Sequence, residues 1–156
     1  MCSVEELILF PYVKECIRAI HEKGYYAIVI TNQSGVARGF FSEHALQEMN
    51  TYLMRQIDVD AVYFCPHLEN GKVKEYSFKC TCRKPQIGMI ERACRDFPID
   101  LKRSYMVGDR ISDILTGKNA GTKTVLLKSS DDKVEEEELT LPDYLFHDLR
   151  QLMAIL

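Results

Sequence analysis

The sequence predicts an α/β fold, a Rossmann-like domain in which helices cover both faces of a mostly parallel sheet and form three layers. Short apolar runs alternate along the chain with longer segments that have helical periodicity. A length of 156 residues fits one domain over residues 1–156. Hydrophobic residues make up 46% and charged residues 28%, which is the balance of a globular protein with an ordinary core.

The first half of the chain provides two helices and two strands. Residues 12–23 carry apolar side chains at helical spacing, and residues 25–30 (YYAIVI) form a continuous apolar run. Such a run is typical of a strand that is buried on both faces. Ser42 is the expected N-cap of a second helix over residues 45–57, and residues 61–64 (AVYF) make the next strand.

The second half continues the alternation after a loop insertion at residues 65–83, where Gly, Pro and mixed charges show no sustained period. The elements expected after it are a helix over 88–96, a strand over 104–107, a helix over 112–120 that Gly121 ends, a strand over 124–127, a weak strand at 145–146 and an amphipathic helix over 148–156. We expect the acidic run 135–138 to be a solvated surface segment.

Composition and charge argue against several kinds of partner. A formal net charge of -3 gives no basic face for nucleic acid or an anionic membrane. The apolar runs are far shorter than the roughly 18 residues that a membrane span needs. The N-terminus carries Glu5 and Glu6 where a signal peptide would be positive. We therefore expect a cytoplasmic protein that binds neither nucleic acid nor membranes.

The strongest local motif is a cysteine and histidine pattern. Cys65-Pro66-His67 is followed, further along the same loop, by Cys80-Thr81-Cys82. Three thiolates and one imidazole match a closed, structural Zn²⁺ site, and metal binding would supply the folding energy that a loop poor in apolar residues lacks. Chance clustering of buried cysteines is the alternative. The three cysteines that occur singly, expected to be small structural hydrophobes, are Cys2, Cys16 and Cys94.

Polar residues follow the predicted strands, where ligands bind in sheets of this kind. The turn 31–35 (TNQSG) offers a hydroxyl and N–H donors for a phosphate, or is a simple turn. The motif GDRISD holds Asp109 and Asp113, which suit Mg²⁺, or is an Asp N-cap followed by an exposed Asp. Arg83 and Lys84 would neutralise phosphate charge, or are an exposed basic pair.

Together, TNQSG after a strand, CPH…CTCRKP, and GDRISD after a later strand resemble the haloacid-dehalogenase-like (HAD) phosphatases. Within that superfamily they look like the group that holds D-glycero-D-manno-heptose 1,7-bisphosphate phosphatase and the histidinol-phosphate phosphatase domain. The resemblance extends from about residue 10 to residue 127, and TNQSGVARGFF is closer to the heptose enzymes. It implies Mg²⁺-dependent hydrolysis of a small phosphorylated metabolite, the 7-phosphate of the heptose bisphosphate, with histidinol phosphate as the alternative substrate.

The resemblance also assigns roles to individual residues. Thr31 and Asn32 would bind the transferred phosphoryl group, and Lys84 would stabilise its negative charge. Asp109 would ligate Mg²⁺, with Asp113 supporting the site. Further substrate contacts would come from Ser34, Gly35, Arg38 and Arg83. A structural Zn²⁺ that shapes the substrate-selecting loop would be held by Cys65, His67, Cys80 and Cys82.

One motif of the family has no match in this sequence, the strand that ends in Asp-x-Asp-Gly-Thr. Its first Asp is the nucleophile that forms an aspartyl-phosphate, and its second is the general acid and base. Residues 1–9 contain no Asp, and Asp58-Val59-Asp60 precedes a strand, so we expect that D-x-D to be a loop at the opposite sheet edge. We therefore expect this chain to be inactive as it stands, and the simplest account is that its N-terminal strand has been truncated. The alternative is a non-catalytic, zinc-containing module that binds phosphate or has a regulatory role.

The missing strand is central in the family, between the strands that correspond to residues 25–30 and 104–107. Unpaired backbone groups along a buried edge would cost about 1–3 kcal/mol each. Residues 7–10 (LILF) could fill the gap, the two neighbouring strands could pair directly, or another chain could supply a strand. We therefore expect a monomer, or a complex in which a partner strand fills the position.

Overall fold

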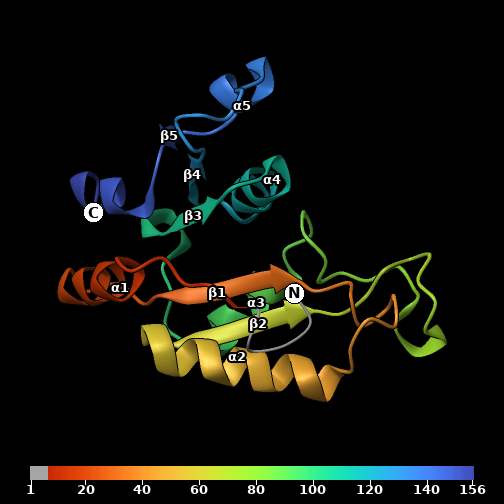
Figure 1. The fold of residues 1–156 in the computed structure, drawn as a ribbon. Coiled ribbons are helices and arrows are strands. Elements are labelled where there is room, and N and C mark those ends of the chain that lie inside the picture. The colour runs from red at the N-terminus through yellow and green to blue at the C-terminus, as the bar shows by residue number, and fades with distance from the viewer. Residues whose placement is uncertain (1–6) are drawn as a thin grey trace. The chain divides into compact units, whose positions relative to one another are not determined.

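The computed structural model describes residues 7–156, and its contacts divide the chain into two compact units, Met1–Arg83 and Lys84–Leu156. The first unit contains α1 (Val13–Glu22), β1 (Ile28–Asn32), α2 (Glu43–Ile57), β2 (Ala61–Cys65) and the 3₁₀ turn η2 (Lys74–Tyr76). The second contains α3 (Gly88–Asp96), η3 (Leu101–Arg103), β3 (Tyr105–Gly108), α4 (Ile111–Ala120), β4 (Lys123–Leu127), α5 (Glu136–Thr140), β5 (Tyr144–Phe146) and η4 (Leu149–Ala154). The expected alternation of strands and helices is confirmed (Figure 1).

All the strand pairs described are parallel. In the first unit β1 pairs with β2, from Ile28 opposite Ala61 to Asn32 opposite Cys65. In the second unit the strand order is β3-β4-β5. Among residues 7–156, β1 and β3 belong to different sheets, and residues 7–10 form no strand. One of the three expected ways to fill the central position, the LILF segment, is therefore wrong for the described residues.

The first unit is built around α2, which lies along one face of its sheet (Figure 1). The Ser42 hydroxyl accepts the Ala45 N–H at 3.1 Å, as expected of an N-cap. The buried core of this unit includes Val36, Leu46 and Met49, with the rings of Phe41, Phe64 and Tyr76 packed against it. Because Tyr76 belongs to the loop after β2, this core joins that loop to the helix.

The first strand begins later than predicted. Tyr25 donates its N–H to the carbonyl of Ile20 at the end of α1, and Ala27 donates to the Asp60 carboxylate at 2.7 Å. These bonds keep residues 25–27 out of the ladder, so β1 begins at Ile28 and includes Thr31 and Asn32. The five residues of β1 are half-buried, not buried on both faces.

The Asp58-Val59-Asp60 segment is a loop before β2, as expected. Asp58 has φ 60 and ends α2 in the left-handed region. Besides accepting the Ala27 N–H, the Asp60 carboxylate lies 2.8 Å from Nε2 of His21. Both bonds tie chain segments together at the amino end of the sheet, so Asp60 has a structural role far from the strand ends where ligands would bind.

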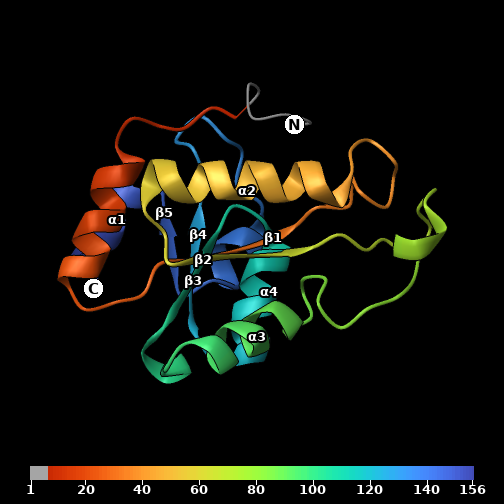
Figure 2. The same cartoon turned by 90° about the horizontal axis from the view of Figure 1, so that it is seen from below.

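The second unit places α4 against β3 and β4 (Figure 2). Gly121 ends the helix with φ 84, as its position predicted. Thr124, buried at the start of β4, exchanges hydrogen bonds with Asp143 and thereby holds the segment before β5. Each of these contacts satisfies a polar group that burial would otherwise leave unpaired.

Two expectations for the C-terminal part need correction. Residues 148–156 do not form an amphipathic α-helix: the 3₁₀ turn η4 covers Leu149–Ala154, because Asp148 and Gln151 cap each other and bonds such as Ile155 N–H to the Leu152 carbonyl close tight turns. The acidic run is not solvated throughout, because Glu138 lies on α5 with its side chain 14% exposed and 2.7 Å from Lys128. No helix in residues 7–156 is long and apolar enough to cross a membrane.

The packing of α4 gives a first prediction. A Cβ at Gly117 would lie 2.6 Å from Cβ of Met106 and 2.7 Å from Cγ2 of Thr124. Overpacking of this kind costs about 1–3 kcal/mol and outweighs the up to about 1 kcal/mol that Ala adds as a better helix former. We expect Gly117→Ala to lower the free energy of unfolding, measured by urea denaturation, whereas the exposed neighbour change Lys118→Ala leaves it nearly unchanged. A Gly117→Ala protein as stable as the native one would contradict this packing.

Candidate metal centre and strand-end polar sites

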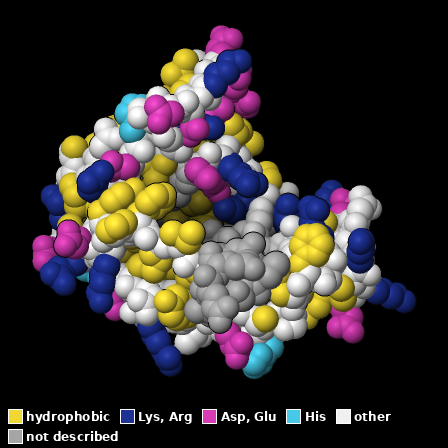
Figure 3. Space-filling view, in the orientation of Figure 1, with side chains coloured by type: hydrophobic (Ala, Val, Ile, Leu, Met, Phe, Trp, Pro, Cys, Tyr) yellow, Lys and Arg dark blue, Asp and Glu magenta, His cyan; other side chains and the backbone are white. Residues whose placement is uncertain are grey.

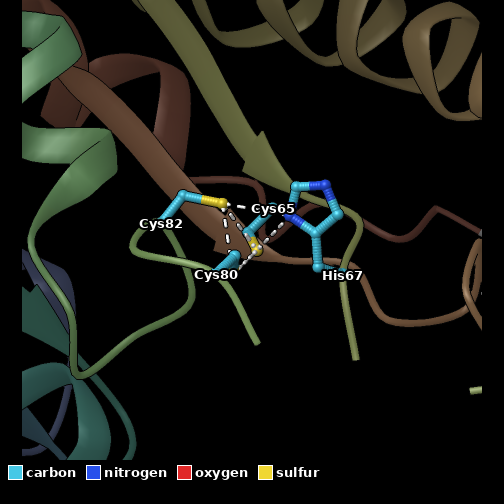
Figure 4. A group of neighbouring side chains, drawn as sticks. All are labelled: Cys65, His67, Cys80 and Cys82. Carbon is cyan, nitrogen blue, oxygen red and sulfur yellow. Dashed lines mark hydrogen bonds between the residues drawn. The ribbon is translucent and has the colours of Figure 1, made fainter. Parts of the chain in front are cut away.

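Four side chains of the first unit converge at the end of β2 (Figure 4). The Sγ atom of Cys82 lies 3.0 Å from Sγ of Cys65 and 3.3 Å from Nδ1 of His67, and Sγ of Cys80 lies 3.5 Å from both other sulfurs. All four ligand atoms lie within 4.8 Å of one another. The structure therefore brings together the four residues that the sequence singled out.

Local folding explains why the four side chains meet. Cys65 is the last residue of β2 and is fully buried, so the strand fixes one ligand. The His67 ring packs 4.3 Å, centroid to centroid, from the Phe78 ring. The Arg83 N–H donates to Sγ of Cys80 at 3.3 Å. The loop 66–82 contains only the short turn η2, as its lack of periodicity predicted.

The electrostatics of the cluster differ from thiol to thiol. Burial raises the pKa of Cys65, and hydrogen bonding with Cys82 raises it further. Burial also raises the pKa of Cys82, and it lowers the pKa of His67 against the opposing charge of Glu43. For Cys80 burial opposes the thiolate, but the Arg83 N–H and the hydrogen bonds from Cys82 and Cys65 outweigh it and lower the pKa. A cation at the centre would favour the thiolates, since metal ligands bind deprotonated.

The donor set fits Zn²⁺. Three soft sulfurs and one imidazole nitrogen are typical of four-coordinate structural sites, and no position remains for a substrate. Of the other cysteines, Cys16 is buried as expected, Cys94 is half-buried, and Cys2 lies outside the described residues. Among residues 7–156 this is the one group of three or more possible His, Cys, Asp or Glu ligands.

The turn at residues 31–35 lies at the end of β1 in the same unit. Thr31 and Asn32 are the last two residues of β1, whereas the sequence placed them after the strand. The side-chain amide of Gln33 donates to the Thr31 hydroxyl at 3.3 Å. The Gln33 N–H donates to the carbonyl of Cys65 at 2.8 Å. Gly35 is half-buried beside the Phe41 ring, and exposed Arg38 donates to the Ser34 hydroxyl at 3.4 Å. The turn and the cysteine cluster therefore share one end of the β1-β2 pair.

The second unit holds the other predicted residues at the end of β3. Asp109 is exposed directly after the strand, and Asp113 is buried on the first turn of α4. Oδ1 of Asp113 lies 2.5 Å from Nζ of Lys84, and its Oδ2 accepts the Arg110 N–H at 3.2 Å. A Cβ at Gly108 would overlap the Asp113 side chain, so the glycine lets that carboxylate approach the strand end.

Two carboxylates suit Mg²⁺, which prefers oxygen ligands, although Lys84 already engages one of them. The alternative of an Asp N-cap followed by an exposed Asp is wrong, because Arg110 is the N-cap and Asp113 is the buried one. The exposed basic pair is also wrong, because Arg83 and Lys84 are both half-buried and both bonded.

Sequence reasoning did not single out Lys128 as a polar group at a strand end, although it directly follows β4 as Asp109 follows β3. Hydrogen bonding to Glu138 is the main cause that raises the pKa of Lys128, and the charges of Asp132 and Asp109 add to it. The available signal was its place immediately after a predicted strand, the same signal that identified Asp109.

The sequence of this chain matches those of known proteins over most of its length. A profile of HAD-hydrolase-like proteins matches residues 81–152. The chain is 37% identical to D-glycero-beta-D-manno-heptose-1,7-bisphosphate 7-phosphatase of Haemophilus ducreyi, over 97% of this chain and 86% of that protein. It is 39% identical to D-glycero-alpha-D-manno-heptose-1,7-bisphosphate 7-phosphatase of Photorhabdus laumondii, over 88% and 80%.

A solved structure is similar over nearly the same span. It is D,D-heptose 1,7-bisphosphate phosphatase from B. bronchiseptica complexed with magnesium and phosphate, with a TM-score of 0.78 and 27% identity. The similarity covers 97% of this chain and 85% of that one. The fold and the sequence therefore match the same group of proteins.

Proposed function

This chain belongs to the HAD-like phosphatases, in the group of the heptose-1,7-bisphosphate 7-phosphatases, and from that premise we propose that it acts on a small sugar phosphate with Mg²⁺. The observation that carries the proposal is the placement of polar groups at the carboxyl ends of parallel strands. Thr31 and Asn32 end β1, and Asp109 follows β3. Ligands bind at such ends in α/β sheets.

The proposed roles follow from the needs of phosphoryl transfer, which depends mainly on positioning and on neutralising charge. Thr31 and Asn32 hold phosphoryl oxygens, and Lys84 neutralises their charge. Asp109 and Asp113 would hold Mg²⁺, which would supply further positive charge for the phosphoryl oxygens. Ser34, Gly35, Arg38 and Arg83 are the proposed contacts to the rest of the substrate.

The nucleophile is the part that the described strands do not provide. No Asp precedes Asp58 in the sequence, and Asp58 and Asp60 lie at the amino end of the sheet. We propose that the reaction proceeds through an aspartyl-phosphate on a strand ending in D-x-D, and that residues 1–156 alone bind the substrate without hydrolysing it. With such a strand, the first Asp would attack phosphorus while the bond from phosphorus to the sugar oxygen breaks, and the second Asp would give that oxygen its proton. The second Asp would then take a proton from the water that hydrolyses the acyl phosphate, which releases inorganic phosphate and restores the first Asp.

The proposed substrate is a heptose bisphosphate, hydrolysed at its 7-phosphate, with histidinol phosphate as the alternative. Relatives of both anomeric specificities match this chain. The proposed Zn²⁺ in the cysteine cluster shapes the loop between β2 and α3. That loop carries exposed Lys72, Lys74 and Lys79, and Figure 3 shows basic side chains along it, at the right of the view. Exposed Glu69 and Glu75 lie on the same loop, so the lysines leave a small positive excess, which favours an anionic substrate.

The test is phosphate release from heptose 1,7-bisphosphate, histidinol phosphate and an aryl phosphate, with Mg²⁺ and with a chelator as control. Residues 1–156 are compared with a version that carries an added N-terminal strand ending in D-x-D. We expect turnover of the heptose bisphosphate only with the added strand, and its loss on Asp109→Asn. Turnover by residues 1–156 would overturn the account of the nucleophile, and full activity of Asp109→Asn would remove that residue from the Mg²⁺ site.

A non-catalytic phosphate-binding module is the second candidate, favoured by the described strands β1 to β5, none of which ends in D-x-D. It predicts that inorganic phosphate or a sugar phosphate binds, as isothermal titration calorimetry would show, while both versions remain inactive. Calorimetry and phosphate release together therefore separate the two functions.

A further inference from the structure

Arg83 is attached to two of the cluster residues at once. Its backbone N–H donates to Sγ of Cys80 at 3.3 Å, and Nη1 of its guanidinium donates to the carbonyl of His67 at 3.4 Å. The side chain is half-buried. Both acceptors belong to residues of the cysteine cluster, so the position of the Arg83 guanidinium depends on the positions of Cys80 and His67.

The middle of the same loop has an anchor that does not involve the cluster. The carbonyl of Ala37 accepts the N–H groups of Lys72 and Val73 at 2.7 and 2.8 Å. The Tyr76 hydroxyl donates to Glu43 at 2.8 Å, and the Tyr76 ring packs on the core of the first unit. Residues 71–77 therefore remain held when the cluster loosens, whereas residues 78–83 depend on it.

The cluster and the proposed phosphate turn also meet directly. Asn32 and Cys65 are register partners at the end of the β1-β2 pair, and the Gln33 N–H donates to the Cys65 carbonyl. One strand end therefore carries the first cluster ligand and the first residues of the turn. If the cluster residues become less well held, the turn is affected through the pairing of Asn32 with Cys65. Arg83 is affected through its hydrogen bonds to Cys80 and His67.

From these contacts we propose that metal binding at the cluster raises the affinity of the phosphate site by fixing Arg83, so that metal and phosphate monoester bind cooperatively. This inference rests on the proposed function. Without a metal, residues 78–83 and the guanidinium sample more conformations, and an anion must order them when it binds. With the metal bound that ordering has already occurred, so less free energy is lost on anion binding.

Cooperativity of this kind is reciprocal. If the metal tightens phosphate binding by a given factor, phosphate tightens metal binding by the same factor. We expect a factor within the common range of roughly 5- to 150-fold. Arg83→Ala should remove the factor while keeping the metal, because the backbone N–H to Cys80 remains. Arg83→Lys keeps the charge without the planar guanidinium and should restore only part of it.

The experiment titrates inorganic phosphate by calorimetry into zinc-loaded and zinc-stripped protein. The variants are Arg83→Ala, Arg83→Lys and, as a matched control, Arg55→Ala, an exposed arginine on α2. We expect zinc to tighten phosphate binding in the native and Arg55→Ala proteins and to have no effect in Arg83→Ala. In a second measurement a chelator withdraws zinc with and without phosphate, beginning from folded, zinc-loaded protein. Zinc and phosphate can also form a complex in solution, which would alter the measured zinc release. The same measurement on Arg83→Ala at the same phosphate concentration corrects for this effect, because it is equal for both proteins.

The outcomes separate this inference from the proposed function. Phosphate that binds equally with and without zinc overturns the coupling and leaves the proposed function standing. If zinc still tightens phosphate binding in Arg83→Ala, the assignment of the coupling to Arg83 is wrong. If the native protein takes up no zinc, the proposed coupling between metal and phosphate is wrong. If phosphate binds in neither state, the proposed function itself fails.

Discussion

Cys80→Ser and Cys82→Ser are each expected to release the metal and to unfold the loop that it closes. Each change removes one of three cysteine side chains whose sulfurs lie 3.0 to 3.5 Å apart. Structural Zn²⁺ contributes about 10–16 kcal/mol of apparent binding free energy in small zinc domains. Losing a direct ligand should cost more than the roughly 10- to 100-fold in affinity that loss of an outer partner costs. Metal content by mass spectrometry and cleavage within residues 66–83 in limited proteolysis measure the two effects.

The structure suggests where the proteolysis should occur. Residues 71–77 keep their bonds to Ala37 and Glu43, so cleavage should concentrate in residues 78–83. Cys94→Ser is the matched control, because Cys94 lies on α3, outside the cluster, and should retain the metal. Native metal content in both Cys80→Ser and Cys82→Ser would defeat the zinc assignment.

Lys84→Met is expected to destabilise the second unit strongly. The Lys84 and Asp113 side chains are 13% and 6% exposed and lie 2.5 Å apart. Removing one partner of a buried pair leaves the other charge uncompensated and typically costs about 3–5 kcal/mol. A fall of this size in the free energy of unfolding, measured by urea denaturation, is the expected result.

A double variant separates the ion pair from the shape of the site. Lys84→Met with Asp113→Leu removes both charges and should recover most of the stability that Lys84→Met loses, because apolar replacements of buried pairs are often neutral. The same double variant should not bind inorganic phosphate, since the proposed neutralising cation is gone. A single variant as stable as the native protein would show that the pair is not structural, and phosphate binding by the double variant would remove Lys84 from the site.

Sequence periodicity predicted the elements whose stability is mostly local. The helix over 88–96 matches α3 residue for residue, and Gly121 ends α4 in the left-handed conformation that its type favours. Ser42 caps α2 as expected. These features depend on residues close in sequence, through side-chain spacing and end caps, so a single chain segment contains the information.

Contacts between distant segments decided the features that sequence reasoning missed. The start of β1 moved to Ile28 because Asp60, far along the chain, takes the Ala27 N–H. The pairing of Lys128 with Glu138 partly buried an acidic run that would otherwise be solvated. Lys84 became half of a buried ion pair only because Asp113 lies beside it. No local pattern encodes such partners.

The sequence by itself determined the alternation of strands and helices and the groups available for binding. Those groups are the polar residues after the strands and the four side chains with the spacing of a Zn²⁺ site. Only the tertiary structure decided which of those groups are linked. It brought the four Cys and His side chains together at the end of β2, bonded Arg83 to two of these residues, and placed Asn32 of the 31–35 turn opposite Cys65. The physical reason is that residue type and spacing determine which ligands a side chain can bind. How firmly that side chain is held, and by which neighbours, depends on hydrogen bonds and burial that only the folded chain creates.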